Sequence, residues 1–217
     1  MKLVMVGGHT RNIGKTSVIE GIIRALPEMN WTAVKITQFG HGVCSVGGQP
    51  CGCAVAEHQF KITEERQRDS GTDTARFLAA GARRALWVRT RQGELVEALP
   101  SFRKEIENDE FVIVESNSLR RFLKPTLYIQ VIDPVNPDLK LSSQELFDFS
   151  DAYLLVSPPR IDDPSRKIIG AQNVLLEREV KRNKSCFTVS AEDRFMNQAI
   201  INLVRSKLVN GFIDAAS

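Results

Sequence analysis

The sequence has few cysteines, few aromatic residues and little net charge. Four cysteines in 217 residues are too few for a disulfide scaffold, and a formal charge of +3 is too small to indicate nucleic-acid binding by itself. No apolar run approaches the roughly 18 residues that a membrane-spanning helix needs, and the first residues do not show a signal-peptide pattern. We therefore expect a cytoplasmic protein with no membrane and no nucleic-acid partner.

What the chain does have is an ordinary globular composition, with 42% hydrophobic and 25% charged residues. Such a length can bury a core without cross-links, so residues 1–217 are expected to form one domain. Short apolar runs alternate with amphipathic stretches, which is typical of βαβ units around a parallel sheet. The sequence predicts an α/β fold with a mostly parallel sheet of about seven strands and helices on both faces. The expected strands are Leu3–Val6, Thr32–Ile36, Phe111–Val114, Leu127–Ile132, Tyr153–Val156 and Phe187–Val189, and the expected helices are Ser17–Leu26, Thr74–Ala82, Ser142–Phe149 and Asp193–Leu208.

The strongest motif is a glycine-rich segment between the first expected strand and the first expected helix. Gly8 is followed by five residues and then by Gly14-Lys15-Thr16, one residue more than the usual GxxxxGK[ST] spacing. In such a loop the backbone N–H groups and the helix N-terminus attract phosphate, the lysine reaches the β- and γ-phosphates, and the hydroxyl binds Mg²⁺. The motif predicts a three-layer P-loop fold that binds GTP or ATP with Mg²⁺; the alternative is a turn that only caps the helix. The predicted cofactor-binding residues are Gly8, Arg11, Asn12, Ile13, Gly14, Lys15, Thr16 and Ser17.

Charged residues at other expected strand and helix ends extend this site. Glu115 ends the Phe111 strand, where P-loop enzymes hold Mg²⁺ or its waters, so Thr16 and Glu115 are the predicted Mg²⁺ ligands. Lys35 lies near the end of the Thr32 strand, and Asp73 begins a helix that either Thr72 or Asp73 could cap. The predicted catalytic residues are Lys15, Lys35, Asp73 and Glu115; for the last three, a purely structural role is the alternative.

The lengthened loop resembles a branch of the P-loop proteins that includes dethiobiotin synthase, the cobyrinate amidases and the accessory GTPase of molybdopterin-guanine dinucleotide biosynthesis (MobB). The loop length is similar to that of dethiobiotin synthase, whereas Gly8-His9 and Asn12 are similar to the accessory GTPase. Val114-Glu115 also matches both relatives, but Ser116-Asn117-Ser118 follows where they usually have glycine. The helix that Asp73-Thr74 opens and Ala80-Gly81-Ala82 closes is similar to one in the accessory GTPase.

This resemblance implies a Mg²⁺-dependent GTPase of molybdenum cofactor biosynthesis that acts with an anionic, pterin-type substrate and forms a homodimer. Arg120, Arg121 and Lys124 would suit such a substrate, although they could equally form a solvated surface. No Asn-Lys-x-Asp guanine motif is present, so the base is open. The alternatives are an ATP-dependent ligase similar to dethiobiotin synthase and a nucleotide-sensing adaptor with little turnover.

A cysteine- and glycine-rich insertion at about residues 38–57 interrupts the α/β pattern. Cys44, Cys51 and Cys53 lie in it with His41, and His58 follows directly. Thiolates with an imidazole suit tetrahedral Zn²⁺, so we predict a Zn²⁺ site of Cys44, Cys51, Cys53 and His58, with His41 as the other choice for the fourth ligand. Free or redox-active thiols and an ordinary loop are the alternatives. Cys186, in the last expected strand, is predicted to be a buried apolar residue.

Overall fold

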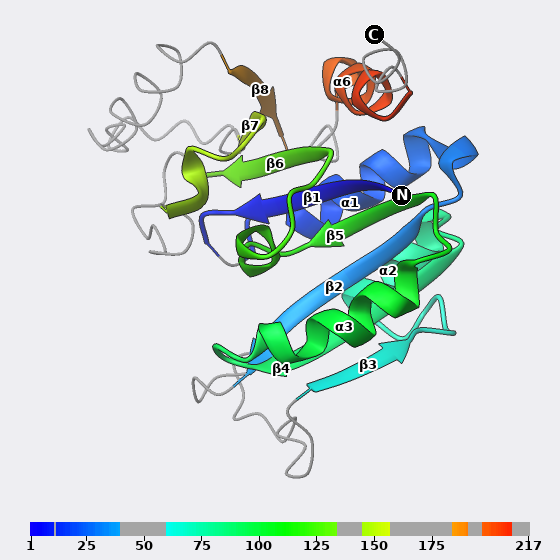
Figure 1. Cartoon of the computed structure of the whole chain (residues 1–217). Coiled ribbons are helices and arrows are strands. Elements are labelled where there is room, and N and C mark those ends of the chain that lie inside the picture. The colour runs from blue at the N-terminus through cyan, green and yellow to red at the C-terminus, as the bar shows by residue number, and fades with distance from the viewer. Residues whose placement is uncertain (11, 40–59, 134–144, 157–183, 191–196, 210–217) are drawn as a thin grey trace, which may run out of the picture.

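The computed structural model describes residues 1–10, 12–39, 60–133, 145–156, 184–190 and 197–209. Within them, one eight-stranded sheet forms the centre, in the order β3-β4-β2-β5-β1-β6-β7-β8 (Figure 1). All neighbouring strands are parallel except β3 and β4, which are antiparallel. The strands are β1 (Lys2–Gly8), β2 (Thr32–Phe39), β3 (Phe60–Glu64), β4 (Arg84–Arg91), β5 (Phe111–Glu115), β6 (Leu127–Ile132), β7 (Ala152–Val156) and β8 (Ser185–Val189).

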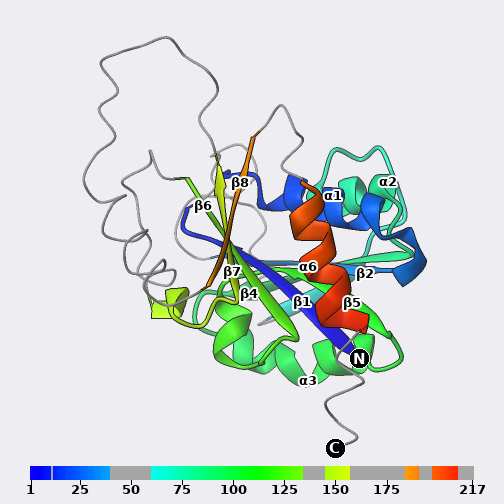
Figure 2. The ribbon, with the colours of Figure 1, turned by 90° about the horizontal axis from the view of Figure 1, so that it is seen from above.

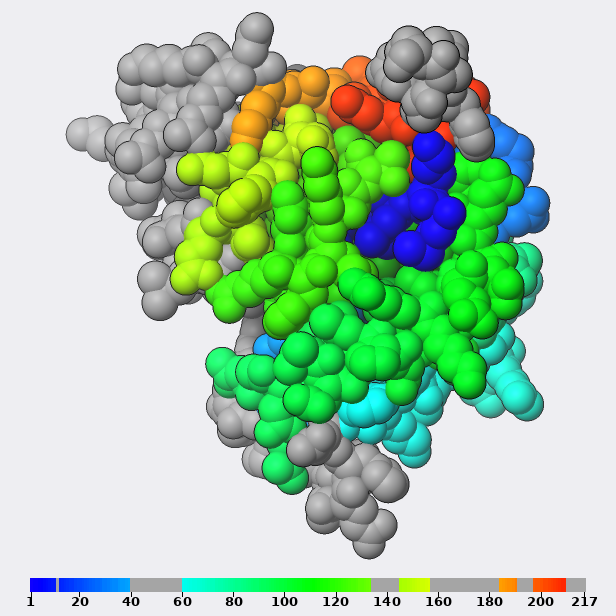
Figure 3. All heavy atoms as spheres, viewed as in Figure 1, coloured from blue at the N-terminus to red at the C-terminus, as the bar shows by residue number. Residues whose placement is uncertain are grey.

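Helices cover both faces of this sheet, so the predicted α/β fold with three layers is confirmed. Figure 2 shows α1 (Lys15–Ala25) and α2 (Asp73–Ala80) on one side and α3 (Leu95–Ile106) on the other. The last helix, α6 (Gln198–Val209), contributes its buried residues to the same core as α1. Figure 3, seen from the α3 side, shows the green atoms of α3 in front of the sheet. Two short 3₁₀ turns, η1 (Pro27–Met29) and η2 (Ser118–Arg121), connect elements.

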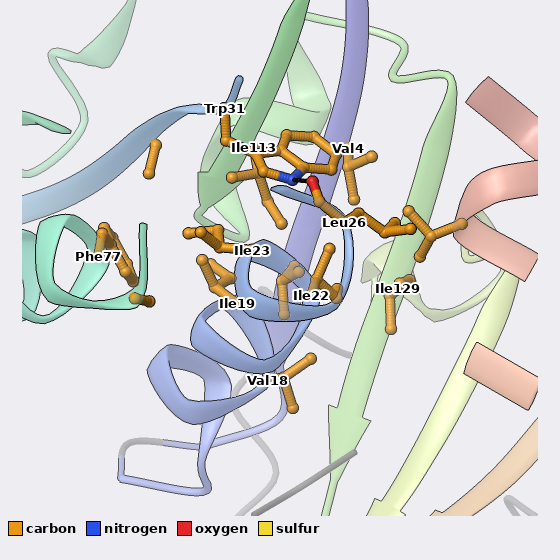
Figure 4. Packing of buried hydrophobic residues seen from close by; sticks show 14 of the residues in the cluster. Val4, Val18, Ile19, Ile22, Ile23, Leu26, Trp31, Phe77, Ile113 and Ile129 are labelled. Carbon is orange, nitrogen blue, oxygen red and sulfur yellow. Dashed lines mark hydrogen bonds between the residues drawn. The ribbon is translucent and has the colours of Figure 1, made fainter. Parts of the chain in front are cut away.

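Two apolar cores lie on the two faces of the sheet. On one face, the buried side of α1 (Val18, Ile19, Ile22, Ile23) packs with Trp31 and with Phe77 of α2 (Figure 4). The indole Nε1 of Trp31 donates a hydrogen bond to the backbone oxygen of Leu26, at 3.0 Å, so its polar atom is satisfied inside the core. On the other face, Leu95 and Phe102 of α3 pack over β2, β4 and β5. The central strands are buried on both faces, as expected for a parallel sheet.

Two of the eight strands, β3 and β4, were not predicted. In β4 the buried residues Leu86 and Val88 alternate with Trp87 and Arg89, which are half-exposed. The cause is that one face of β4 packs on α3, while the other is only partly covered. The continuous apolar run of β4, Ala85–Val88, is only four residues long, and a run of that length fits a strand or part of a helix equally well.

The expected position of Cys186 is wrong. It lies on β8, at the edge of the described sheet, and its side chain is exposed because no described strand or helix covers it. Of the expected helix at Ser142–Phe149, only residues 145–149 are described, and 145–147 are helical. None of the helices in the described part of the chain is both long enough and apolar enough to cross a membrane.

Candidate functional site

The glycine-rich segment connects the end of β1 at Gly8 to the start of α1 at Lys15. Gly14 caps α1 with a φ of 93°, in the left-handed region that a residue with a side chain adopts only at a cost. At Gly8 the loop passes close by, because a Cβ there would lie 2.5 Å from Cδ1 of Ile13 and 2.9 Å from Cδ of Lys15, so both side chains would have to move. The Nζ of Lys15 donates to the backbone oxygen of Thr10 at 2.9 Å, so the lysine folds over the loop. The backbone therefore has the strand, loop and helix order of a phosphate-binding loop.

Thr16, in the first turn of α1, contacts Glu115 at the end of β5. Its hydroxyl donates to Oε2 of Glu115 at 2.8 Å, and both side chains are buried. The contact follows from strand register, since β5 lies between β1 and β2 with Glu115 level with Val6 on one side and Lys35 on the other. The hydroxyl of the loop and the carboxylate of the neighbouring strand, which were predicted as Mg²⁺ ligands, therefore lie together.

Lys35 lies between two carboxylates. Its ammonium group forms ion pairs with Glu115 and with Asp73, the latter at 2.8 Å. Burial alone would lower the pKa of Lys35, but the charges of Glu115 and Asp73 outweigh burial and raise it above its ordinary 10.5. Burial likewise would raise the pKa of Asp73, but the positive charges of Lys35 and Arg76 lower it. Lys35 is therefore charged, and Asp73 ionised, at neutral pH.

Asp73 is free for this pairing because another residue caps α2. The hydroxyl of Thr72 accepts the N–H of Ala75 at 3.1 Å, which settles the choice of cap that the sequence left open. Asp73 then projects from the first turn toward Lys35.

Arg76 joins the two helices beside this site. Its guanidinium group forms two hydrogen bonds with the buried Glu20 of α1, both at 3.0 Å, and a third with the hydroxyl of Ser17 at 3.1 Å. The same group lies 3.5 Å from Asp73. Arg76 was not among the predicted site residues; it lies one helical turn after Asp73, which is the signal that could have identified it.

Asn117 is a second residue that sequence reasoning missed. The N–H of Gly8 donates to Oδ1 of Asn117, and Nδ2 of Asn117 donates to the carbonyl of Gly8, both at 2.7 Å. Strand β5 has ended at Glu115, so the side-chain amide takes the position that the next backbone groups of β5 would have occupied beside β1. The departure from the glycine of the relatives, at Ser116-Asn117-Ser118, was the available signal.

The donor set at this site fits Mg²⁺. The side chains of Thr16, Asp73 and Glu115 offer hydroxyl and carboxylate oxygens, the hard ligands that Mg²⁺ prefers when it also holds phosphates and water. The carboxylates already face a cation, the ammonium group of Lys35, which shows that they are oriented to hold positive charge.

The other predicted residues have different outcomes. Arg11, Cys44, Cys51, Cys53, His41 and His58 lie outside the described residues, and within the described part of the chain there is no group of three His, Cys, Asp or Glu residues that could hold a metal ion. Arg120 stacks on the ring of Phe149, at 4.9 Å, and Arg121 pairs with Glu145. Two of the three cations in the expected substrate cluster are thus engaged by neighbouring side chains.

No family model matches the chain, and no curated protein matches it. Among solved structures, a MobB protein homologue from Bacillus stearothermophilus is 13% identical, with a TM-score of 0.42 over 96% of this chain and 98% of that one. MobB from Bacillus subtilis is 14% identical, with a TM-score of 0.40 over 95% and 98%. LpxK from Aquifex aeolicus, in a structure described as a complex with ATP, is 15% identical, with a TM-score of 0.41 over 88% and 70%. The P-loop fold itself is shown by the strand order and by the loop between β1 and α1.

Proposed function

We propose that the chain binds a nucleoside triphosphate with Mg²⁺ in the loop after β1 and hydrolyses it. The observation that carries this proposal is the 2.8 Å hydrogen bond from Thr16 to Glu115. P-loop enzymes need a hydroxyl of the loop and a carboxylate from the adjacent strand at one Mg²⁺ ion, and here the two groups already touch.

Each residue of the site has a task in this proposal. Lys15 would leave the carbonyl of Thr10 and neutralise the β- and γ-phosphates, and the first N–H groups of α1 would donate to phosphate oxygens. Thr16 and Glu115 would hold Mg²⁺, with Asp73 beside them. When bound, Mg²⁺ would offset the negative charge of the phosphate oxygens.

Lys35 supplies the second positive charge at this edge of the sheet. Its raised pKa keeps the ammonium group charged, and its side chain is only 16% exposed, so solvent screens the charge weakly. Positive charge held in place at the strand ends would stabilise the negative charge that develops on the transferred phosphoryl oxygens. The ion pairs with Asp73 and Glu115 would keep the ammonium group at this position when phosphates bind.

The finer parts of the proposal rest on the residues that resemble the accessory GTPase, Gly8-His9, Asn12 and the helix that begins at Asp73. They are a preference for GTP, a role in molybdenum cofactor biosynthesis with a pterin-type anionic substrate, and a homodimeric assembly.

Calorimetric titration of non-hydrolysable GTP and ATP analogues, with and without Mg²⁺, tests the proposal. We expect binding by the wild type that Lys15→Ala weakens at least a hundredfold, since the lysine contacts two phosphates. Lys104→Ala on the exposed side of α3 is the matched control and should bind as the wild type does. Equal affinity of the wild type and Lys15→Ala for the nucleotide analogues would contradict the proposal. Preference for ATP would remove the GTPase assignment and favour a ligase.

Phosphate release then separates hydrolysis from binding alone. Glu115→Gln should keep nucleotide affinity within about tenfold and reduce the turnover rate at least a hundredfold, because it removes a carboxylate at the Mg²⁺ ion. Binding without measurable phosphate release by the wild type would support a nucleotide-sensing adaptor instead.

A further inference from the structure

Beyond the proposed nucleotide site, the ends of β2 and β4 have a face that the described helices do not cover. Ala33 of β2 and Ala85 of β4 are buried in the same core as Phe77 of α2. Two and four residues later, on the same face of each strand, the side chains are only half-buried: Lys35 and Thr37 on β2, and Trp87 and Arg89 on β4. This face is opposite α3, whose core takes up the intervening Val34, Ile36, Leu86 and Val88.

Two cations on this face lie directly opposite each other. In the antiparallel pair of β3 and β4, Lys61 is level with Arg89, and their neighbours Ile62 and Val88 point into the core on the α3 side. Like charges at directly opposite positions destabilise a strand pair. Among the described residues, neither Lys61 nor Arg89 forms a salt bridge. The fold therefore tolerates a repulsion that an anion bound between the two would remove.

An aromatic ring adjoins the two cations. The guanidinium group of Arg89 stacks on the ring of Trp87, 4.6 Å from the ring centre, and its Nε is buried without a hydrogen-bond partner in the described part of the chain. The indole Nε1 of Trp87 donates to the hydroxyl of Thr37 at 2.9 Å, so the orientation of the ring is fixed. A buried donor without a partner carries a cost that a ligand oxygen can relieve.

The nearby carboxylates are engaged elsewhere. Glu65 lies just beyond the end of β3 and accepts hydrogen bonds from the hydroxyl of Thr72 and from the N–H of Gln67. Asp73 and Glu115 hold Lys35. Lys35 is also the residue of β2 that is level with Trp87, so the aromatic and cationic face adjoins the candidate nucleotide site directly.

We propose that the face formed by Lys61, Trp87 and Arg89, with Thr37 at its edge, binds a small molecule with a planar ring and an anionic group. The ring contacts the indole of Trp87, and the anion lies between Lys61 and Arg89. Because Trp87 is level with Lys35, this molecule is the second substrate of the proposed nucleotide site, and only that assignment rests on the proposed function. This proposal puts the anionic substrate at Lys61 and Arg89, and not at Arg120 and Arg121 as the sequence suggested.

The two tryptophans of the chain allow a direct test, because their indole N–H signals can be followed separately by ¹H–¹⁵N NMR. Trp31 is fully buried and hydrogen-bonded inside the core (Figure 4), so it is the internal reference. The probe is phenyl phosphate, titrated into wild type and into Lys15→Ala, with signals assigned from Trp31→Phe and Trp87→Phe. We expect a saturable shift of the Trp87 signal alone, with a dissociation constant on the order of millimolar for a probe of this size.

Substitutions on the face should separate binding from folding. Arg89→Gln and Lys61→Gln should each weaken binding about tenfold, the loss expected for one charge-assisted contact. Arg103→Gln, an exposed residue of α3 on the opposite side, is the matched control and should leave binding unchanged. Lys61→Gln should keep or raise the thermal midpoint, because it removes the repulsion with Arg89. A mere folding defect would lower the midpoint.

The outcomes distinguish this inference from the proposed function. A Trp87 shift that persists in Lys15→Ala supports the site even if nucleotides fail to bind. A wild type that binds nucleotide but shows no saturable Trp87 shift overturns the inference, and so does a shift that Lys15→Ala abolishes, since the probe would then report on the loop. Tighter binding of a single-stranded oligonucleotide that depends on Arg89 and Lys61 overturns the assignment to a small molecule.

Discussion

Asn117 holds Gly8 by both of its backbone groups, with two hydrogen bonds of 2.7 Å that run in opposite directions. The side-chain amide thus continues the pairing of β1 beyond the point where β5 ends, and it fixes the residue from which the phosphate loop departs. Asn117, two residues after the end of β5, therefore fixes the position of the first glycine of the loop.

Replacing Asn117 should affect both stability and the loop. Asn117→Ala leaves the N–H and carbonyl of Gly8 without these partners, so we expect a loss of about 1–3 kcal/mol in the free energy of unfolding and weaker binding of triphosphate. Asn117→Asp keeps an acceptor for the N–H but places a carboxylate oxygen against the carbonyl, so it should not restore the wild-type value. Urea unfolding measures the effect, with Asn202→Ala on the exposed surface of α6 as the control. A change no larger than that of the control would contradict this role.

Removing the ammonium group of Lys35 should leave two carboxylates facing each other. For Lys35→Met we expect a loss of about 3 kcal/mol at pH 7, near the low end for a broken buried ion pair because solvent partly screens Asp73. Lys104→Met on the exposed side of α3 should change stability by less than about 0.5 kcal/mol. Urea unfolding of both variants and of the wild type provides the comparison.

The same variant has a pH dependence of predictable sign. In the wild type, the lowered pKa of Asp73 means that its contribution is present above about pH 4, its unfolded value, and is lost as the pH falls through the folded value. The raised pKa of Lys35 makes its own contribution fully present below about pH 10.4 and lost only above it. Without Lys35, acid protonates Asp73 and relieves the repulsion. The difference in free energy of unfolding between wild type and Lys35→Met should therefore be smaller at pH 4 than at pH 7. A larger difference at pH 4 would show that loss of the ion pair does not cause the destabilisation.

The sequence was sufficient to predict the centre of this site for a geometric reason. Glu115 ends β5 as expected, but Lys35 does not end its strand, because β2 continues to Phe39. The two side chains still lie together, since parallel pairing puts Lys35 level with Glu115. Thr16 follows from the loop motif in the same way. Thr16, Lys35 and Glu115 lie in contact in the structure, and their roles toward Mg²⁺ and phosphate stay predictions.

Among the parts that the sequence did not predict are the role of Asn117 and the elements β4 and α3. They depend on where a strand ends and on which faces of an element are covered. The role of Asn117 exists only because β5 ends before it is level with Gly8, and strand ends are the least reliable part of a sequence-based prediction. β4 was missed because its only continuous apolar run, Ala85–Val88, is four residues long and lies between arginines, and so short a run does not distinguish a strand from the end of a helix. α3 carries Pro100 within its span, which obscured an otherwise helical spacing of apolar residues.

The two tyrosines of the chain are buried but should respond to the same substitution with opposite signs. The hydroxyl of Tyr128 has no hydrogen-bond partner among the described residues, and burial raises the pKa of this group far above its ordinary 10. The hydroxyl of Tyr153 donates to the backbone oxygen of Phe147. Tyr128→Phe should therefore raise the free energy of unfolding by about 1 kcal/mol, and Tyr153→Phe should lower it by about the same amount. Thermal unfolding of the two variants decides; a destabilised Tyr128→Phe would mean that this hydroxyl has a partner after all.

The contributions of Arg76 and Glu20 to stability should depend on each other, and lysine should not replace arginine in this pair. Two parallel hydrogen bonds of 3.0 Å join the guanidinium group to the carboxylate of the buried Glu20, and a third contact reaches Ser17, next to the Mg²⁺ ligand Thr16 in the proposed site. A double-mutant cycle of Arg76→Gln and Glu20→Gln should give a coupling energy of about 1 kcal/mol, since Arg76 is partly exposed and solvent screens the pair.

Arg76→Lys tests whether the fork geometry matters, because an ammonium group cannot make two parallel bonds to one carboxylate. It should recover less than half of the coupling energy in urea unfolding, and it should weaken triphosphate binding together with Arg76→Gln, because α1 and α2 would no longer be joined beside Asp73. If Arg76→Lys recovers the full coupling energy, the contact depends on charge alone and not on the fork geometry of arginine. A zero coupling energy would show that the two helices are held by their apolar contacts alone.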